Sequence, residues 1–249
     1  MSYAKDIGFN LESSAMAAEH AAKWPWCYAA VGCHPHDAKE MDDMKLALIR
    51  DLAAKDKVVA IGEIGLDFHY DLSDRDIQRE WFRKQIRLAN ELKMPIVIHA
   101  READQEVMDI LKEEGAFSDE RKGWFPERPI LKEGRPAFAP DARVLLHCFS
   151  GSAELGKQYV KLGATISVAG PVTYKNNKKT VAMVEAIPLE YLLVETDSPY
   201  LTPVPFRGKR NIPLFVEYTA RKVAEIKDVS FEEVAKATRE NAKRFYGIK

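Results

Sequence analysis

Imidazole and carboxylate side chains close several apolar runs of this sequence. The residues concerned are His34 after CYAAVGC, Glu63 after VVAIG, His99 in PIVIHA, His147 in RVLLHC and Asp197 in YLLVETD. Such groups act as general acids and bases, and they also bind divalent cations. Buried charges without partners are costly, so carboxylates at these positions call for a neutralising partner.

Short apolar runs alternate with amphipathic helical patterns along most of the chain. Helices are expected over Leu11–Lys23, from a Ser73-x-x-Asp76 box, after Ser152 and after Ser230. Strands are expected at 27–33, 58–63, 95–100, 143–148, 164–170 and 191–197. The strands are apolar at consecutive positions, which is typical of parallel strands covered on both faces. A doubly wound sheet and a (β/α)8 barrel both fit this alternation.

The polar residues favour the barrel, because each stands at the carboxyl end of its expected strand. A closed barrel gathers these ends at one rim, where barrel enzymes carry their active sites. Two imidazoles and two carboxylates at that rim predict a divalent cation, and mixed nitrogen and oxygen ligands suit Mg, Zn or Mn. Glu195 lies two residues before Asp197. It could accept a hydrogen bond from a ligand or support the barrel floor, and we favour the first.

Each residue also has an ordinary structural explanation. A single His at a strand end is usually structural, and a Glu or Asp there is usually a helix cap or a turn residue. The metal hypothesis therefore depends on the whole set of residues.

A set of motifs resembles the TatD family of metal-dependent deoxyribonucleases, in the order and spacing of that family. The motifs are GCHPHD (32–37), GEIGLD (62–67), VIHAR (97–101), LHCFSG (146–151), ETDSPYL (195–201) and RGKRNIP (207–213). The resemblance implies a TIM-barrel hydrolase with one or two divalent metal ions that cleaves phosphodiesters. It also implies that Glu63, His99, His147 and Asp197 are metal ligands and that His34 and Arg101 lie near the substrate.

Three features depart from the family pattern. The usual first strand with its His-x-His pair, the following helix and most of the second strand are not found, about forty residues of a (β/α)8 barrel. Ile212 replaces a glutamate that is common in the family. The connection at 115–142 is unusually long, and we place it on the barrel face opposite the metals. Because a missing unit leaves strand edges uncovered, we expect low activity or self-association through that region.

The mechanism implied is attack by water on a phosphodiester. Asp197 is the expected proton acceptor, and Glu63 is expected to hold the metal in position. The loop after the last strand carries the expected phosphate contacts Arg207, Lys209, Arg210 and Asn211. A second basic run, YKNNKK (174–179), could also contact a nucleic-acid backbone. A short basic run is usually only a solvated loop. The run that contains Arg207 and Arg210 follows the Asp197 strand, and this position favours phosphate binding.

Composition limits the classes of protein. The 249 residues form one expected domain over 1–249, and the 37 basic and 38 acidic residues give a net charge of -1. No overall field therefore attracts nucleic acid or a membrane, and a polyanion site must be local. Three cysteines inside apolar runs indicate reduced core thiols and a cytoplasmic location.

Two alternatives to a nuclease stay open. The metal ligands alone do not specify the bond that is cleaved, so an amidohydrolase acting on a C–N or carboxylic ester bond is the second hypothesis. The third is a truncated barrel with little activity.

Overall fold

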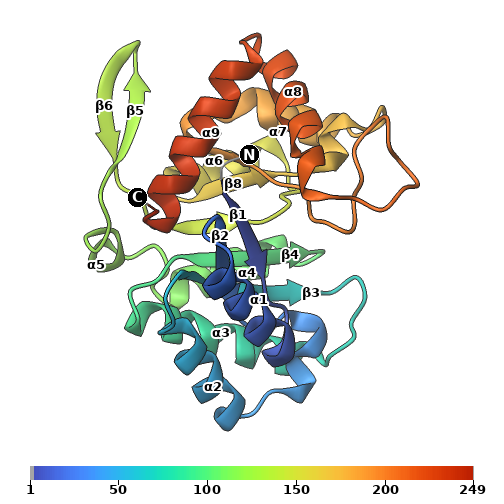
Figure 1. Cartoon of the computed structure of the whole chain (residues 1–249). Coiled ribbons are helices and arrows are strands. Elements are labelled where there is room, and N and C mark those ends of the chain that lie inside the picture. The colour runs from blue at the N-terminus through green and yellow to red at the C-terminus, as the bar shows by residue number, and fades with distance from the viewer. Residues whose placement is uncertain (1–2, 249) are drawn as a thin grey trace. The chain divides into compact units, whose positions relative to one another are not determined.

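The computed structural model describes residues 3–248, and the chain divides into two compact units. Unit 1 consists of Met1–Trp124 and Ala142–Leu145, and unit 2 consists of Phe125–Asp141 and Leu146–Lys249. Each unit has its own strands and covering helices (Figure 1). None of the helices in the described part of the chain is long and apolar enough to cross a membrane.

Unit 1 is built from parallel strands joined by helices. Strands β1 to β4 lie in chain order, and each neighbouring pair is parallel. The elements are β1 (Ala4–Ile7), α1 (Leu11–Lys23), β2 (Cys27–Val31), the 3-10 helix η1 (Pro35–Glu40), α2 (Asp43–Ala53), β3 (Val58–Asp67), α3 (Arg75–Glu91), β4 (Ile96–Arg101), α4 (Asp104–Glu113) and α5 (Asp119–Lys122). The α/β class and the alternation predicted from the sequence are therefore confirmed in this unit.

Two of the predicted boundaries in unit 1 are wrong. Helix α3 is capped by Asp74 rather than Ser73, because the Ser73 hydroxyl donates to the carbonyl of His36 and accepts the N–H of Lys39. Strand β3 continues to Asp67, so Glu63 lies inside the strand and not at its end. Helix α1, in contrast, covers the predicted residues.

Helix α3 fixes the two backbone segments that carry the polar residues of unit 1. Its buried face contains Gln78 and Gln85 among apolar side chains. Gln78 accepts the N–H of Asp67 at 2.9 Å and donates to its carbonyl at 3.1 Å. Gln85 bonds both backbone groups of Cys33 in the same way, at 2.7 and 3.1 Å. Buried amides satisfied on both sides hold these segments in place.

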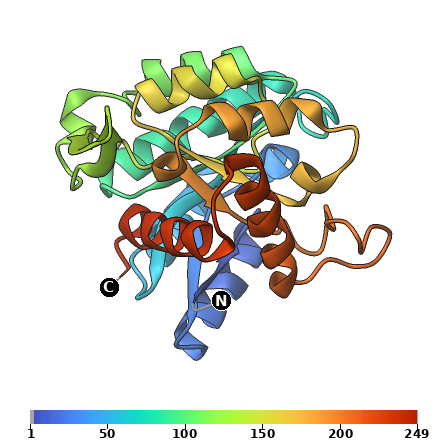
Figure 2. The same cartoon turned by 90° about the horizontal axis from the view of Figure 1, so that it is seen from above.

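Unit 2 contains a hairpin, two paired parallel strands and the C-terminal helices. The elements are β5 (Arg128–Lys132), β6 (Arg135–Ala139), α6 (Ala153–Lys161), β8 (Thr165–Val168), η2 (Gly170–Thr173), α7 (Lys178–Ala186), η3 (Leu189–Tyr191), β9 (Leu192–Val194), η4 (Pro213–Phe215), α8 (Val216–Lys227) and α9 (Phe231–Tyr246). Strand β7 (Val144–Leu146) has residues in both units. Helices α8 and α9 lie side by side (Figure 2). Ser152 and Ser230 cap α6 and α9 as predicted.

The expected long connection at 115–142 is largely structured. It contains α5 in unit 1 and the antiparallel hairpin β5–β6 in unit 2. The turn residues Glu133 and Gly134 have φ angles of 52° and 73°. Positive φ at both central positions is what a two-residue type I′ turn requires.

Candidate metal centre

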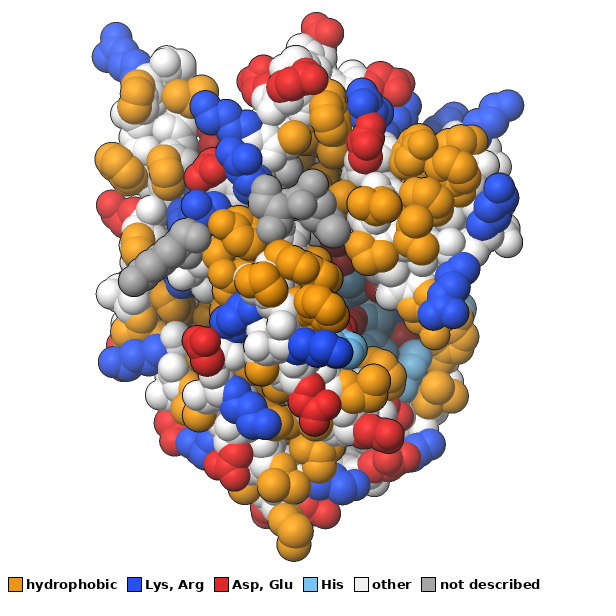
Figure 3. Space-filling model, viewed as in Figure 1, with side chains coloured by type: hydrophobic (Ala, Val, Ile, Leu, Met, Phe, Trp, Pro, Cys, Tyr) orange, Lys and Arg blue, Asp and Glu red, His pale blue; other side chains and the backbone are white. Residues whose placement is uncertain are grey.

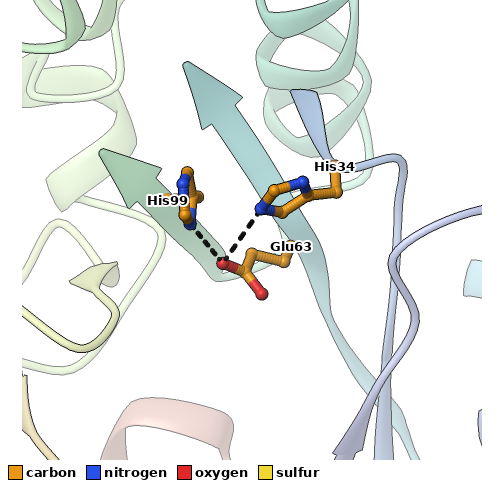
Figure 4. A group of neighbouring side chains, drawn as sticks. All are labelled: His34, Glu63 and His99. Carbon is orange, nitrogen blue, oxygen red and sulfur yellow. Dashed lines mark hydrogen bonds and ion pairs between the residues drawn. The ribbon is translucent and has the colours of Figure 1, made fainter. Parts of the chain in front are cut away.

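Three polar side chains of unit 1 converge (Figure 4). One ligand-type atom from each of His34, Glu63 and His99 lies within 4.8 Å of the others. Glu63 Oε1 is 2.9 Å from His99 Nδ1 and 3.8 Å from His34 Nε2. Two imidazoles and a carboxylate at this spacing have the donor chemistry of a divalent metal site.

The two glycines beside Glu63 explain how the carboxylate reaches His99. Gly62 and Gly65 have φ angles of 155° and 151°, which side chains rarely adopt. A Cβ on Gly65 would lie 1.9 Å from the carbonyl oxygen of His99, and one on Gly62 would lie 2.6 Å from Val97 Cβ. Only glycine therefore allows β3 and β4 to approach so closely around the site.

His34 has a different role from His99 in the hydrogen-bond pattern. Its Nδ1 accepts the N–H of His36 at 3.2 Å, so in the neutral ring the proton is on Nε2, which faces Glu63. Burial, followed by the nearby His99, lowers the pKa of His34 to about 3, which keeps the ring neutral. A neutral ring that presents an N–H suits contact with an anionic oxygen better than metal ligation.

Sequence reasoning gave no role to Asp67 and His36, although both stand in the quoted motifs. Asp67 is fully buried, and its Oδ2 is 2.9 Å from His99 Nε2 and 3.0 Å from His36 Nε2. Its Oδ1 accepts the backbone N–H groups of His69 and Tyr70. Burial alone would raise the pKa of Asp67, but these hydrogen bonds more than offset it, so its pKa lies below the usual range. The sequence signal that could have indicated Asp67 is its place four residues after Glu63 on the same strand.

His99 consequently lies between two carboxylates. Its Nε2 is on the Asp67 side, and its Nδ1 is on the Glu63 side. An imidazole whose distal N–H is held by a buried carboxylate is a common arrangement for metal ligands. Nδ1 is thus the nitrogen that a cation beside Glu63 would use.

Unit 2 contains a second imidazole between two carboxylates. His147 Nδ1 is 2.5 Å from Glu195 Oε2, and its Nε2 is 3.3 Å from Asp197 Oδ1. The backbone N–H of Cys148 donates to the other oxygen of Glu195 at 2.7 Å. Burial alone would raise the pKa of Glu195, but the charge and hydrogen bond of His147 lower it overall. Glu195 therefore contacts the imidazole of His147, as expected for the favoured alternative, in which it accepts a hydrogen bond from a ligand residue.

The predicted metal ligands are thus distributed over the two units. Glu63 and His99 lie in unit 1, and His147 and Asp197 lie in unit 2. That the four residues bind metal together stays a prediction.

The expected substrate contacts differ in their surroundings. The Arg101 guanidinium lies 4.6 Å from the centre of the Tyr70 ring, and that of Arg207 lies 4.1 Å from the Tyr174 ring. Lys209 and Arg210 are exposed. Asn211 is only 2% exposed, and its amide donates to the carbonyls of Thr196 and Tyr200, so it shapes the loop after β9.

Comparison with known proteins agrees with these observations. The sequence profile of the family described as "TatD related DNase" matches residues 3–247. The chain is 46% identical over 242 residues to the uncharacterized metal-dependent hydrolase YabD of Bacillus subtilis, covering 97% of this chain and 86% of that protein. It is 37% identical over 241 residues to the uncharacterized metal-dependent hydrolase TatD of Mycobacterium tuberculosis, covering 94% and 82%.

A solved structure extends the likeness to the fold. The crystal structure of YjjV, a TatD homologue from Escherichia coli K12, has a TM-score of 0.85 and 25% sequence identity, covering 100% of this chain and 88% of that one. The predicted fold class, an α/β fold of the TIM-barrel type, is confirmed by this likeness. Profile, relatives and fold lead to one conclusion: the chain belongs to the TatD family.

Proposed function

We propose that this protein is a metal-dependent hydrolase that cleaves phosphodiester bonds of nucleic acid, with DNA as the expected substrate. The observation that supports metal binding is the pair of imidazoles, His99 and His147. His99 is held by the buried carboxylate of Asp67 and His147 by the partly buried carboxylate of Glu195, and the other nitrogen of each ring lies toward a second carboxylate. The family and the names of the relatives support hydrolysis. The cations Arg207, Lys209 and Arg210 lie in the loop after β9, in a stretch of sequence with no acidic residue between Asp197 and Glu217, and they support a phosphate substrate.

The residues present fit a divalent cation. Glu63 and His99 Nδ1 would hold it in unit 1, and His147 Nε2 and Asp197 would contribute from unit 2. A cation bound there supplies a Lewis acid for the phosphoryl oxygen and makes a nearby water more acidic. Asp67 and Glu195 orient the imidazoles and keep the required nitrogen free of its proton.

The remaining residues act on the substrate. The Nε2–H of His34 is placed to donate to a phosphate oxygen. Asp197, the more exposed of the two unit 2 carboxylates, is the proposed proton acceptor. The guanidinium of Arg207 can bind a phosphate with two N–H groups. Cytoplasmic nucleic acid is the partner that we expect.

The test is hydrolysis by the purified full chain before and after chelation and with added Mg²⁺, Mn²⁺ or Zn²⁺. Substrates are a DNA strand, an RNA strand of the same sequence and a panel of amides. We expect metal-dependent cleavage of the nucleic acid, and we expect His147→Ala to lose bound metal and activity together. His20→Ala, which changes an exposed imidazole paired with Asp6, is the control.

Two results would overturn the proposal. Cleavage of amides without cleavage of either nucleic acid would establish the amidohydrolase alternative. A folded, metal-loaded protein that is inactive on all substrates would indicate a barrel without this activity.

A further inference from the structure

Two loops of unit 2 carry cations without acidic neighbours. They are residues 174–179 after η2 and 206–210 after β9, called here the basic loop pair. No Asp or Glu occurs between Glu154 and Glu185 or between Asp197 and Glu217. In Figure 3, the surface over the loop after β9 shows basic and hydrophobic side chains.

The lack of neutralisation contrasts with the rest of the described chain. Arginines elsewhere form close ion pairs, such as Arg87 with Glu114 and Arg75 with Asp71, both at 2.6 Å. Within residues 3–248, no ion pair joins an acid to the cations of the basic loop pair, which are Lys175, Lys178, Lys179, Arg207, Lys209 and Arg210. Cations left together without acids repel one another, and an anionic ligand relieves that repulsion.

The segments that lead into the two loops are fixed to each other. The hydroxyl of Tyr174 donates to the carbonyl of Thr202 at 3.0 Å, and the N–H of Val204 donates to the Thr173 hydroxyl at 2.9 Å. A Cβ on Gly170 would lie 2.1 Å from the carbonyl oxygen of Leu201, so at this point the two backbones are in direct contact. The cations are therefore presented on a defined surface.

A shallow, open cavity of about 350 Å³ lies between the loops. It is lined by Tyr174, Lys175, Asn176, Asn177 and Arg207. This volume lies at the lower end of the range of roughly 300–1,000 Å³ typical of small-ligand sites. Asn177 is a wall residue, because its side chain caps α7 and donates to the carbonyl of Pro171. The cations that face the cavity are Lys175 and Arg207, and no lining residue is acidic.

The guanidinium of Arg207 lies over the ring of Tyr174 at this cavity, and the pair is called here the Arg207–Tyr174 platform. The guanidinium lies 4.1 Å from the ring centre, and the ring is anchored through its hydroxyl. Arg207 is exposed, so the part of its guanidinium away from the ring can contact a ligand. Unpaired bases stack on aromatic rings and on arginine planes, whereas paired bases cannot.

We propose that this cavity is a subsite for one nucleotide of single-stranded nucleic acid, with the base on the Arg207–Tyr174 platform and the phosphate bound by Lys175. The remaining cations of the basic loop pair extend beyond one phosphate, which favours a strand over a free anion. The inference rests on the proposed function, because it assumes that the substrate is nucleic acid.

The test measures binding and needs no cleavage. A fluorescent, hydrolysis-resistant phosphorothioate DNA strand is titrated with the full chain, and its anisotropy is followed at several salt concentrations. Tyr174→Ala should weaken binding about 5- to 150-fold, the equivalent of about 1–3 kcal/mol for one stacked base. Lys175→Ala should reduce the slope of log K against log salt by about one. Tyr174→Phe keeps the ring and should bind nearly as well as the unchanged chain.

Lys157→Ala is the matched control, because Lys157 is exposed on α6 and lies outside the basic loop pair. Equal weakening by Lys157→Ala and Lys175→Ala would overturn the subsite in favour of a diffuse charge effect. Unchanged binding by Tyr174→Ala would also overturn it. Inorganic phosphate and a single nucleotide are also compared as competitors of the strand. If phosphate displaces the strand at the same concentration as the nucleotide does, the site binds only an anion, which contradicts the proposal.

The same samples separate this proposal from the proposed function. Hydrolysis of bis(p-nitrophenyl) phosphate, a small phosphodiester, is measured with the unchanged chain. If the chain cleaves DNA and this diester but the Tyr174 and Lys175 variants bind normally, only the subsite is wrong. If the variants weaken binding as expected but no phosphodiester is cleaved, the subsite holds and the proposed function is wrong.

Discussion

At the residue scale, each unit presents an imidazole between two carboxylates. His99 uses Nε2 for the buried Asp67 and Nδ1 for Glu63, whereas His147 uses Nδ1 for Glu195 and Nε2 for Asp197. A neutral imidazole can donate through only one nitrogen. Asp67 selects that nitrogen in His99 and Glu195 selects it in His147, so the opposite nitrogen of each ring has its lone pair toward the position of a cation.

We predict that Asp67→Asn weakens metal binding about 10- to 100-fold, the usual effect of removing the acceptor behind a ligand imidazole. An amide cannot accept from His99 and His36 as the carboxylate does. Isothermal titration with Mn²⁺ or Zn²⁺ measures the affinity. Asp71→Asn is the control, because Asp71 is exposed and forms an ion pair with Arg75. Equal affinities for the Asp67 and Asp71 variants would rule out the orienting role.

Sequence patterns identified the principal polar residues but not their pairings. Glu63, His99, His147 and Asp197 were found because each interrupts an apolar run. Asp67 and His36 were missed, because hydrogen bonds between residues of different elements leave no periodic signal. The amide of Asn211 bonds the loop backbone, which the basic motif did not indicate, and its contact with substrate stays a prediction.

At the element scale, helix α3 couples the core of unit 1 to its polar site. The apolar pattern predicted a helix here, but it did not predict that Gln78 and Gln85 are buried. Gln78 bonds the backbone of Asp67, and Gln85 bonds that of Cys33, next to His34. A glutamine on the inner face of an amphipathic pattern usually marks only the edge of the apolar stripe. Its partners can be known only once the strands are placed.

We predict that Gln85→Leu lowers the free energy of unfolding by about 2–4 kcal/mol, because both backbone groups of Cys33 lose their buried partner. Urea denaturation of the variant measures this. The exposed Gln158 of α6 provides the control substitution Gln158→Leu, which should change stability by no more than about 0.5 kcal/mol. A Gln85 variant as stable as the control would mean that Cys33 finds other partners.

The hairpin β5–β6 was not predicted, because Pro129 and Pro136 argue against strands in that segment. Its base is anchored by a buried ion cluster. Asp141 Oδ1 is 3.0 Å from Arg128 and its Oδ2 is 3.1 Å from Arg244, and Arg128 also donates to the carbonyl of Ala164. The segment therefore contributes to unit 2 as structure and not as a flexible linker.

We predict that Asp141→Asn destabilises the protein by about 3–5 kcal/mol, because the buried guanidinium of Arg128 and the partly buried one of Arg244 lose this carboxylate. Chemical denaturation again gives the value. Glu133→Gln, at the exposed turn of the same hairpin, should have almost no effect. If both variants unfold at the same denaturant concentration, the cluster does not hold the hairpin.

At the scale of the whole molecule, function must come from local charge. The net charge is -1, while the basic loop pair has no acidic residue. The net charge therefore does not indicate whether the chain binds a polyanion, whereas the distribution of charge along the sequence indicates where a polyanion would bind. The alternation of strands and helices predicted the fold class, because parallel strands and their helices repeat over the whole chain.

The final prediction concerns metal and global stability. If Glu63, His99, His147 and Asp197 bind one centre, a cation at a hundred times its Kd should stabilise the folded chain by about 2.7 kcal/mol. Thermal unfolding before and after chelation measures this as a shift in Tm. His99→Ala and His147→Ala should each abolish the shift, because each removes a ligand from the shared centre, whereas the exposed His20→Ala should keep it. A shift that survives His147→Ala but not His99→Ala would confine the metal ligands to unit 1 and contradict the joint set.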